Sequence, residues 1–336
     1  MSMQNVYIVK PGRMRRQHNT LRFEYEEGGH KYFPIEQTDS LFVMVPLELN
    51  TKLLEFLSQH KIPLHIFNYY GFYSGSFMPR EKLVTGPVLV QQAVHSDSDE
   101  KRIIIAQEIL KGASANLLKN VRQFVRDGLI KEDQPLIDEL KNRQSEISET
   151  QTIEELMGIE GSMRRSYYKL VDGVIMQRST EFVMNKRVKR PPNNKMNSLI
   201  SFVNSLLYAS VLNEIYHTHL NASISYLHEP QDRRYSLALD LSEVFKPLLS
   251  DRLIFRLVNL NMLSNNCFDE VENVCYLNDK GRKIVLTEYH KKLNTKIQHR
   301  ILKRKVSYQR LIRLECYKLV KHLLGEKKYT SFKMWW

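Results

Sequence analysis

The chain has 336 residues, of which 42% are apolar, and carries a net charge of +13. This length allows two domains with a sizeable buried core. No stretch approaches the roughly 20 consecutive apolar residues of a membrane helix, and the first residues lack a secretory pattern. The three cysteines form no Cys-x-x-Cys pair, which excludes a disulfide framework and a cysteine metal knuckle. We therefore expect a cytoplasmic protein that does not enter a membrane.

Residues 1–95 are predicted to form a small β-rich domain. VYIVK at 6–10 is a short strand, and two runs around Gly28-Gly29 predict a hairpin. SLFVMVP is predicted to be a buried strand, LNTKLLEFLSQH a short helix begun by Asn50 or Thr51, and IPLHIFN with FYSGSF a second hairpin. The domain has 10 basic and eight acidic residues, so we expect assembly or docking rather than polyanion binding.

Residues 96–336 are predicted to form a larger helical domain. Apolar residues follow helical spacing in KRIIIAQEILKGASANLLKNVRQFV, in IEELMGIEGSMRRSYYKLVDGVI and in NSLISFVNSLLYASVLNEIYHTHL. RVKRPPNNKMN is predicted to be a loop, because Pro191-Pro192 cannot continue a helix. The predicted fold class is α+β, with a β-sandwich-like N-terminal domain before an all-helical domain.

The positive charge is concentrated at the C-terminal end. Residues 281–336 contain 16 Lys and Arg against three Glu, which leaves 34 basic and 34 acidic residues in the first 280. Such a segment indicates a surface that meets a polyanion; a solvated, mobile tail is the alternative. Its apolar residues recur as on amphipathic helices with basic outer faces, namely Ile301, Val306, Leu311, Leu314, Leu319 and Leu323.

A few acidic and imidazole residues stand out by their surroundings. Glu160 lies between two glycines, His228 ends an apolar run before a proline, and Asp240 and Glu243 are three residues apart on one helical face. Two carboxylates and an imidazole suit Mg²⁺ or Mn²⁺ better than structural zinc. Residue types alone leave open that each of these side chains is merely solvated or a satisfied boundary residue.

Three motifs occur in order: GIEG at 158–161, YLHEP at 226–230 and LALDLSEVFKP at 237–247. With the loop at 190–197, the early hairpin, the IPLHIF segment and NDKGRKIVLTEY, they closely resemble the CRISPR-associated adaptation endonuclease family. Members of this family are the integrase subunits that insert spacers into CRISPR arrays. The resemblance spans nearly the whole chain.

The resemblance implies a metal-dependent endonuclease and integrase that acts on DNA by phosphoryl transfer with Mg²⁺ or Mn²⁺. Its metal ligands fall on Glu160, His228 and Glu243, and its companion acid falls on Asp240 in an orienting role. The family also implies a homodimer formed through the β-rich domain and a second small adaptation protein as partner. The sequence departs from the family's small residues after Glu160 at Met163 and Arg164.

Basic residues around these motifs are candidates for DNA phosphate contacts by charge: Arg164, Arg165, Lys186, Arg187, Lys189 and Arg190. A solvated helix face is the alternative for them. His217 and His219 resemble a metal pair, but no motif surrounds them. Two other functions compete with the integrase: a catalytically silent DNA-binding assembly subunit, and a stand-alone nuclease acting on branched DNA or RNA.

Overall fold

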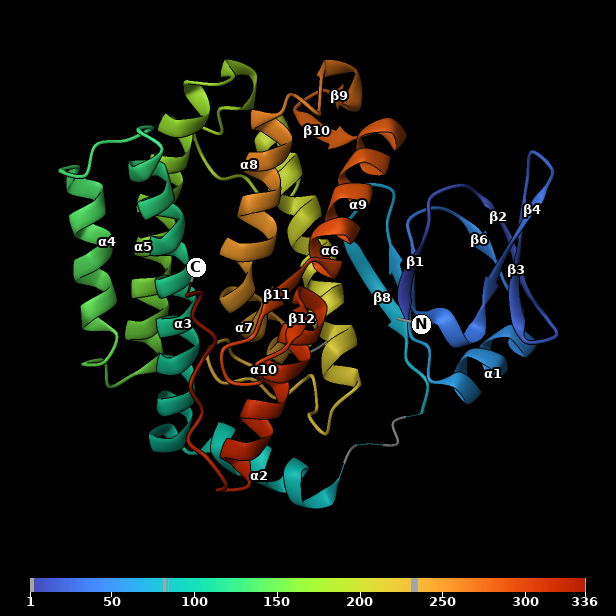
Figure 1. The fold of residues 1–336 in the computed structure, drawn as a ribbon, viewed down its shortest axis with the longest axis horizontal. Helices are drawn as coiled ribbons and strands as arrows, with labels where there is room; N and C mark the ends of the chain where they lie inside the picture. Colours follow the sequence, from blue (N-terminus) through green and yellow to red (C-terminus); the bar gives the residue numbers. More distant parts are fainter. Residues whose placement is uncertain (1–2, 81–82, 84, 231–234, 336) are drawn as a thin grey trace.

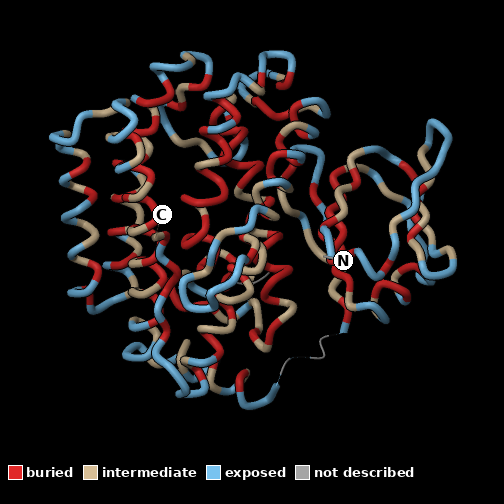
Figure 2. Tube along the Cα trace, viewed as in Figure 1, coloured by how far each residue is buried: buried red, intermediate tan, exposed pale blue. Residues whose placement is uncertain are grey.

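The computed structural model describes residues 3–80, 83, 85–230 and 235–335. Strands fill the first part of the chain, and helices fill most of the rest (Figure 1). Buried residues follow the inner faces of the helices, whereas the outer face of the α4 helix and the tips of the hairpins are exposed (Figure 2). This arrangement confirms the predicted α+β class.

In the part of the chain that the structure describes, the N-terminal domain contains two four-stranded sheets, one α-helix and a short 3-10 helix at Ile35–Gln37. In chain order its elements are β1 (Gln4–Ile8), β2 (Gly12–Gln17), β3 (Thr20–Tyr25), β4 (His30–Pro34), β5 (Thr38–Val43), β6 (Leu47–Glu48), α1 (Thr51–His60), β7 (Leu64–Phe67) and β8 (Tyr73–Phe77). One sheet has the order β1-β5-β7-β8 and the other β4-β3-β2-β6. The predicted hairpin between β3 and β4 turns at Gly28 and Gly29, whose φ angles of +92° and +86° favour glycine.

The helical domain follows. Its elements are α2 (Gly86–Asp97), α3 (Asp99–Arg126), α4 (Pro135–Glu146), α5 (Ile153–Met176), α6 (Lys195–Tyr216), α7 (Ser236–Phe245), a π-helical segment (Lys246–Asp251), α8 (Arg252–Asn259), hairpin strands β9 (Phe268–Val271) and β10 (Val274–Leu277), α9 (Asp279–Asn294), hairpin strands β11 (Lys296–Gln298) and β12 (Lys305–Ser307), and α10 (Tyr308–Leu323). Helix α2 is joined to this domain, because Gln92 and Ser96 donate to backbone carbonyls of residues 221–225. The last strand of the N-terminal sheets ends at Phe77, ahead of the predicted boundary at residue 95.

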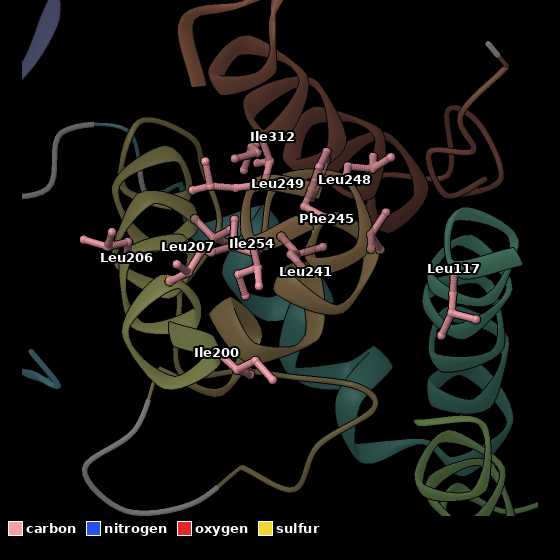
Figure 3. Packing of buried hydrophobic residues seen from close by; sticks show 14 of the residues in the cluster. Leu117, Ile200, Leu206, Leu207, Leu241, Phe245, Leu248, Leu249, Ile254 and Ile312 are labelled. Carbon is pink, nitrogen blue, oxygen red and sulfur yellow. The ribbon is translucent and has the colours of Figure 1, made fainter. Parts of the chain in front are cut away.

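Helices α6 and α7 form the centre of the helical core. Leu207 of α6, Leu241 and Phe245 of α7 and Ile312 of α10 belong to the same buried cluster (Figure 3). By length and composition α6 could cross a membrane, and 83% of its most apolar window is buried inside the protein. A buried core helix passes the same test, so this finding is weak evidence of a membrane span.

The described part of the C-terminal basic segment, residues 281–335, is folded, so the interpretation as a mobile tail is wrong. Its last residues lie along α3 (Figure 1), where the side chain of Asn116 bonds the backbone of Phe332 and Met334 at 3.0 and 2.7 Å. This close approach requires Gly112, because a Cβ there would lie 1.9 Å from Ser331 Oγ.

The amphipathic-helix prediction for this segment holds only from residue 308. Ile301 is 79% exposed in the turn between β11 and β12, whereas Leu311, Leu319 and Leu323 are buried on α10. His299 Nδ1 accepts from the backbone N–H groups of residues 301 and 302, which stabilises the turn instead of a helix.

Candidate metal centre

Helix α5 presents Glu160 and Arg164 on one face. The helix starts with a capping box in which Thr152 and Glu155 bond each other's backbone N–H groups. Glu160 and Arg164 are four residues apart and therefore neighbours on the helix surface. Arg164 Nη2 lies 3.2 Å from Glu160 Oε1, and each side chain is 19% exposed. Glu160 is thus fixed by an arginine of its own helix.

His228 is held by Asp240. The carboxylate of Asp240 is fully buried at the middle of α7 and accepts from the backbone N–H groups of residues 226, 227 and 228 at 2.7, 3.0 and 2.9 Å. His228 Nδ1 lies 2.8 Å from Asp240 Oδ1. Since a carboxylate can only accept, Nδ1 carries a proton in this contact. Nε2 is left as the ring atom that can bind a metal ion.

The same contact sets the protonation of His228. Burial disfavours the charged imidazole, but the hydrogen bond and the charge of Asp240 outweigh burial, so the pKa of His228 is raised above its ordinary value. Asp240 therefore orients the ring and increases its basicity, which is the usual arrangement around a metal-binding histidine.

Glu243 lies on the same helix and faces two cations. Its side chain is only 4% exposed and contacts the guanidinium of Arg164 with one oxygen and the ammonium of Lys246 with the other. Burial would raise the pKa of Glu243, but Lys246, Arg164 and His228 outweigh burial and lower it to about 2. Glu243 is therefore ionised throughout the physiological range.

These contacts join two of the three predicted ligands, and the third lies in their neighbourhood. Arg164 contacts both Glu160 and Glu243, so carboxylates from α5 and α7 reach the same guanidinium. His228 is close enough to Glu243 to lower its pKa. Among the residues that the structure describes, no three histidine, cysteine or carboxylate side chains already stand at metal-binding spacing, and the guanidinium of Arg164 lies between the two carboxylates.

The donor set fits a divalent ion. Glu160 and Glu243 supply hard carboxylate oxygens, and His228 keeps Nε2 for a metal ion because the buried carboxylate of Asp240 holds its Nδ1. Asp240 is less suited to direct contact, since four hydrogen bonds occupy its two oxygens. The geometry thus favours Glu243 over Asp240 as the ligand on α7.

Asp251 is a further acid near this centre that the sequence analysis missed. It ends the π-helical segment that continues α7, and such segments are frequent at functional sites. Burial is the largest influence on Asp251 and raises its pKa to about 6, although Arg164, Tyr167 and Lys246 oppose the increase. Its Oδ2 is buried without a hydrogen-bond partner.

Asp251 gives a prediction about stability and pH. Because the folded-state pKa of this carboxyl exceeds its ordinary value, its contribution is present at low pH and is lost as pH rises through 6. Asp251→Asn is expected to raise the free energy of unfolding at pH 7.5 by about 2–3 kcal/mol and to leave it nearly unchanged at pH 4.5. Urea denaturation at the two pH values checks this. Equal effects at both values would show that ionisation of Asp251 costs nothing.

The six basic candidates for phosphate contact separate into two groups. Arg164 contacts the carboxylates, and Arg187 donates to Asn197 Oδ1 at 2.9 Å and Ser201 Oγ at 3.0 Å, where it stabilises the loop before α6. The other four are exposed: Arg165, Lys186, Lys189 and Arg190. The exposed group is the one available to a phosphate backbone.

The histidine pair at the end of α6 belongs to a different region. His217 Nε2 lies 3.8 Å from Asp39 of β5, and the neighbouring Glu214 is paired with Arg313 of α10 at 2.6 Å. Burial, the largest influence, lowers the pKa of His217 to about 4 despite Asp39. This network joins the N-terminal sheet to α6 and α10, so its place in the fold favours a structural role.

Comparison with known proteins identifies the family. The family model described as "CRISPR associated protein Cas1" matches residues 6–291. A CRISPR-associated endonuclease Cas1 of Thermodesulfovibrio yellowstonii is 47% identical over 99% of this chain and 100% of that protein. The structure of a Cas1 protein from Thermotoga maritima is 39% identical with a TM-score of 0.86, covering 98% of this chain and 100% of that one.

A casposase bound to integration product shares the fold at a TM-score of 0.87 and 18% identity, over 99% of this chain and 93% of that one. The match to the family model covers most of the chain, and the identity to the Thermodesulfovibrio yellowstonii protein extends over nearly its full length. The ordered motifs, the two-domain fold and these similarities agree, and the chain belongs to the CRISPR-associated Cas1 family.

Proposed function

We propose that this protein is a metal-dependent DNA endonuclease and integrase of CRISPR adaptation, which inserts short DNA spacers into a CRISPR array. The observation that carries the proposal is that Glu160 of α5 and Glu243 of α7 contact the same guanidinium of Arg164, while His228 lies near enough to Glu243 to influence its pKa. The casposase that shares this fold is bound to an integration product, which agrees with the proposal.

Each side chain has a separate role in this reaction. Glu160, His228 and Glu243 would hold Mg²⁺ or Mn²⁺, which when bound neutralises charge on a scissile phosphate and lowers the pKa of an attacking hydroxyl. Asp240 keeps a proton on His228 Nδ1, which leaves Nε2 as the nitrogen that would bind the ion. A 3′-hydroxyl as nucleophile gives strand joining and water gives cleavage, so the same residues serve both outcomes.

The partners of the reaction follow from the resemblance to the family. We propose that the protein acts in the cytoplasm as a homodimer formed through its β-rich domain, together with a second small adaptation protein. The exposed Arg165, Lys186, Lys189 and Arg190 flank the motifs that carry the ligands and would contact DNA phosphates.

Cleavage and joining assays test the proposed function. With Mn²⁺ we expect nicking of branched DNA, and with the small partner we expect joining of a short duplex with free 3′-hydroxyls to a plasmid carrying a CRISPR repeat. EDTA should abolish both reactions. DNA binding without either reaction would favour the silent assembly subunit, and cleavage that never becomes joining when the partner is present would favour a stand-alone nuclease.

The exposed basic residues give a prediction about salt. Replacing Lys186, Lys189 and Arg190 by alanine is expected to weaken DNA binding. It should also reduce the magnitude of the slope of log affinity against log salt concentration by about two to three, because each phosphate contact adds roughly 0.9 to that slope. Fluorescence anisotropy between low and physiological salt measures this change.

A control variant loses the same charge elsewhere. Lys10, Lys31 and Lys52 are exposed on the N-terminal domain, and their replacement by alanine should change the slope less. If both triple variants have the same slope, the residues before α6 act only through net charge.

A further inference from the structure

Arg164 occupies the position between the two carboxylates that would bind the metal ion. Its Nε and Nη2 atoms lie 3.3 and 3.2 Å from Glu160 Oε1, and Nη2 also contacts Glu243 Oε2. Lys246 contacts the other oxygen of Glu243. One guanidinium therefore links α5 to α7, and it occupies the carboxylate lone pairs of Glu160 and Glu243 that a divalent ion would need.

The burial of the two glutamates explains why a cation such as Arg164 lies between them. Glu243 is 4% exposed and Glu160 is 19% exposed. Two partly buried carboxylates that face each other repel, and their loss of hydration is costly unless a cation neutralises them. In the metal-free protein Arg164 and Lys246 supply that neutralisation and keep the side chains of both glutamates in place.

Arg164 also has other groups to contact if it leaves the carboxylates. Its guanidinium lies 6.0 Å from the ring centre of Tyr168, within the range of a cation–π contact. Asp251 is buried nearby, and its Oδ2 accepts no hydrogen bond from the described residues. An arginine with these neighbours can move away from Glu160 and Glu243 without becoming an unpaired buried charge.

We propose that Arg164 is a displaceable internal cation, which holds Glu160 and Glu243 in the metal-free protein and leaves them when a divalent ion binds. The inference rests on the proposed function, because it requires the ion to bind these two carboxylates. Arg164 is a positioning residue: it preorganises the ligands and competes with the ion for them. The affinity for the metal ion therefore depends partly on the free energy needed to displace Arg164 from the two glutamates.

Calorimetric titration of the full-length protein with Mn²⁺ at constant pH tests the inference. Arg164→Ala is expected to bind Mn²⁺ about ten- to a hundredfold more tightly than the wild type, since charged hydrogen bonds of this kind no longer have to be broken. Arg164→Lys should fall between the two, because a single ammonium replaces the broader guanidinium.

Arg165→Ala is the matched control. Arg165 is the next residue of α5, is exposed, and has no described ion pair with Glu160 or Glu243, yet its loss removes the same charge. The affinity of Arg165→Ala for Mn²⁺ should differ from that of the wild type by less than about threefold. A change of about this size is what the loss of one exposed positive charge causes through long-range electrostatics. Equal tightening in both variants, or weaker binding by Arg164→Ala, would overturn the inference.

Thermal unfolding supplies a second readout that does not depend on activity. Without metal, Arg164→Ala should unfold at a lower temperature than Arg165→Ala, and the same excess concentration of Mn²⁺ should raise its Tm by more, because stabilisation by a ligand grows with the logarithm of its concentration divided by its dissociation constant. A smaller increase than in Arg165→Ala contradicts the inference.

Failure of the proposed function gives a different pattern. If Glu160→Gln and Glu243→Gln bind Mn²⁺ as the wild type does, the ion binds elsewhere. Both the proposed metal centre and the proposed role of Arg164 would then be refuted. If those two variants lose binding while Arg164→Ala behaves like Arg165→Ala, the metal centre stands and only the role of Arg164 is refuted.

Discussion

His228→Ala is expected to lower Mn²⁺-dependent cleavage and joining of DNA by about a thousandfold or more. The substitution removes the only nitrogen among the three proposed ligands, and metal-ion catalysis supplies several kcal/mol of transition-state stabilisation. DNA binding should stay close to that of the wild type, because phosphate contacts come from other residues. Single-turnover kinetics on branched DNA measures the rate, and anisotropy measures the binding.

The control for this variant is His30→Ala. His30 is exposed on β4 in the N-terminal domain, and its replacement should leave both rates unchanged within about a factor of two. If His228→Ala retains more than a tenth of the wild-type rate, the imidazole is not part of the reaction centre.

Asp240→Asn is expected to have the second large effect, on stability as well as on activity. Both carboxylate oxygens accept hydrogen bonds, at 2.7–3.0 Å, from the backbone of residues 226–228 and from His228. An amide turns one acceptor into a donor that faces donors inside the protein. We expect a loss of about 2–5 kcal/mol of unfolding free energy and a roughly 10- to 100-fold loss of Mn²⁺ affinity.

Urea denaturation and calorimetric titration measure these two losses. Asp279→Asn is the control, because the side chain of Asp279 is 86% exposed on α9 and its loss should change stability by less than about 0.5 kcal/mol. A fully stable Asp240→Asn variant that no longer binds Mn²⁺ at all would instead make Asp240 the direct ligand in place of Glu243.

The sequence patterns predict most of the helical domain because its helices have local signals. Thr152 and Glu155 form the capping box that starts α5, and Asn194 caps α6 directly after the diproline loop. The prediction fails at Ile301 and Val306, where apolar spacing indicated a helix and the structure has the hairpin of β11 and β12. The hairpin there depends on contacts of His299 with the following backbone, and a periodic pattern carries no information about them.

The sequence predicts which residues form the candidate site, but it does not predict the contacts between them. Arg164 was predicted to contact phosphate, yet its closest partners include Glu243, 79 positions away in the sequence. No sequence motif marks Asp251 as a site residue. Its place near Arg164 of α5 follows from the π-helical segment that continues α7. Contacts between α5 and α7 depend on how the two helices pack in the core, and residue spacing does not determine that packing.

The central claim is that Glu160, His228 and Glu243 bind one divalent ion. Anomalous diffraction from crystals grown with Mn²⁺ tests this claim most directly. We predict one strong anomalous peak bounded by the side chains of these three residues, with Arg164 moved away from Glu160 and Glu243. A strong peak elsewhere, or none at a Mn²⁺ concentration that supports DNA cleavage, would contradict the account.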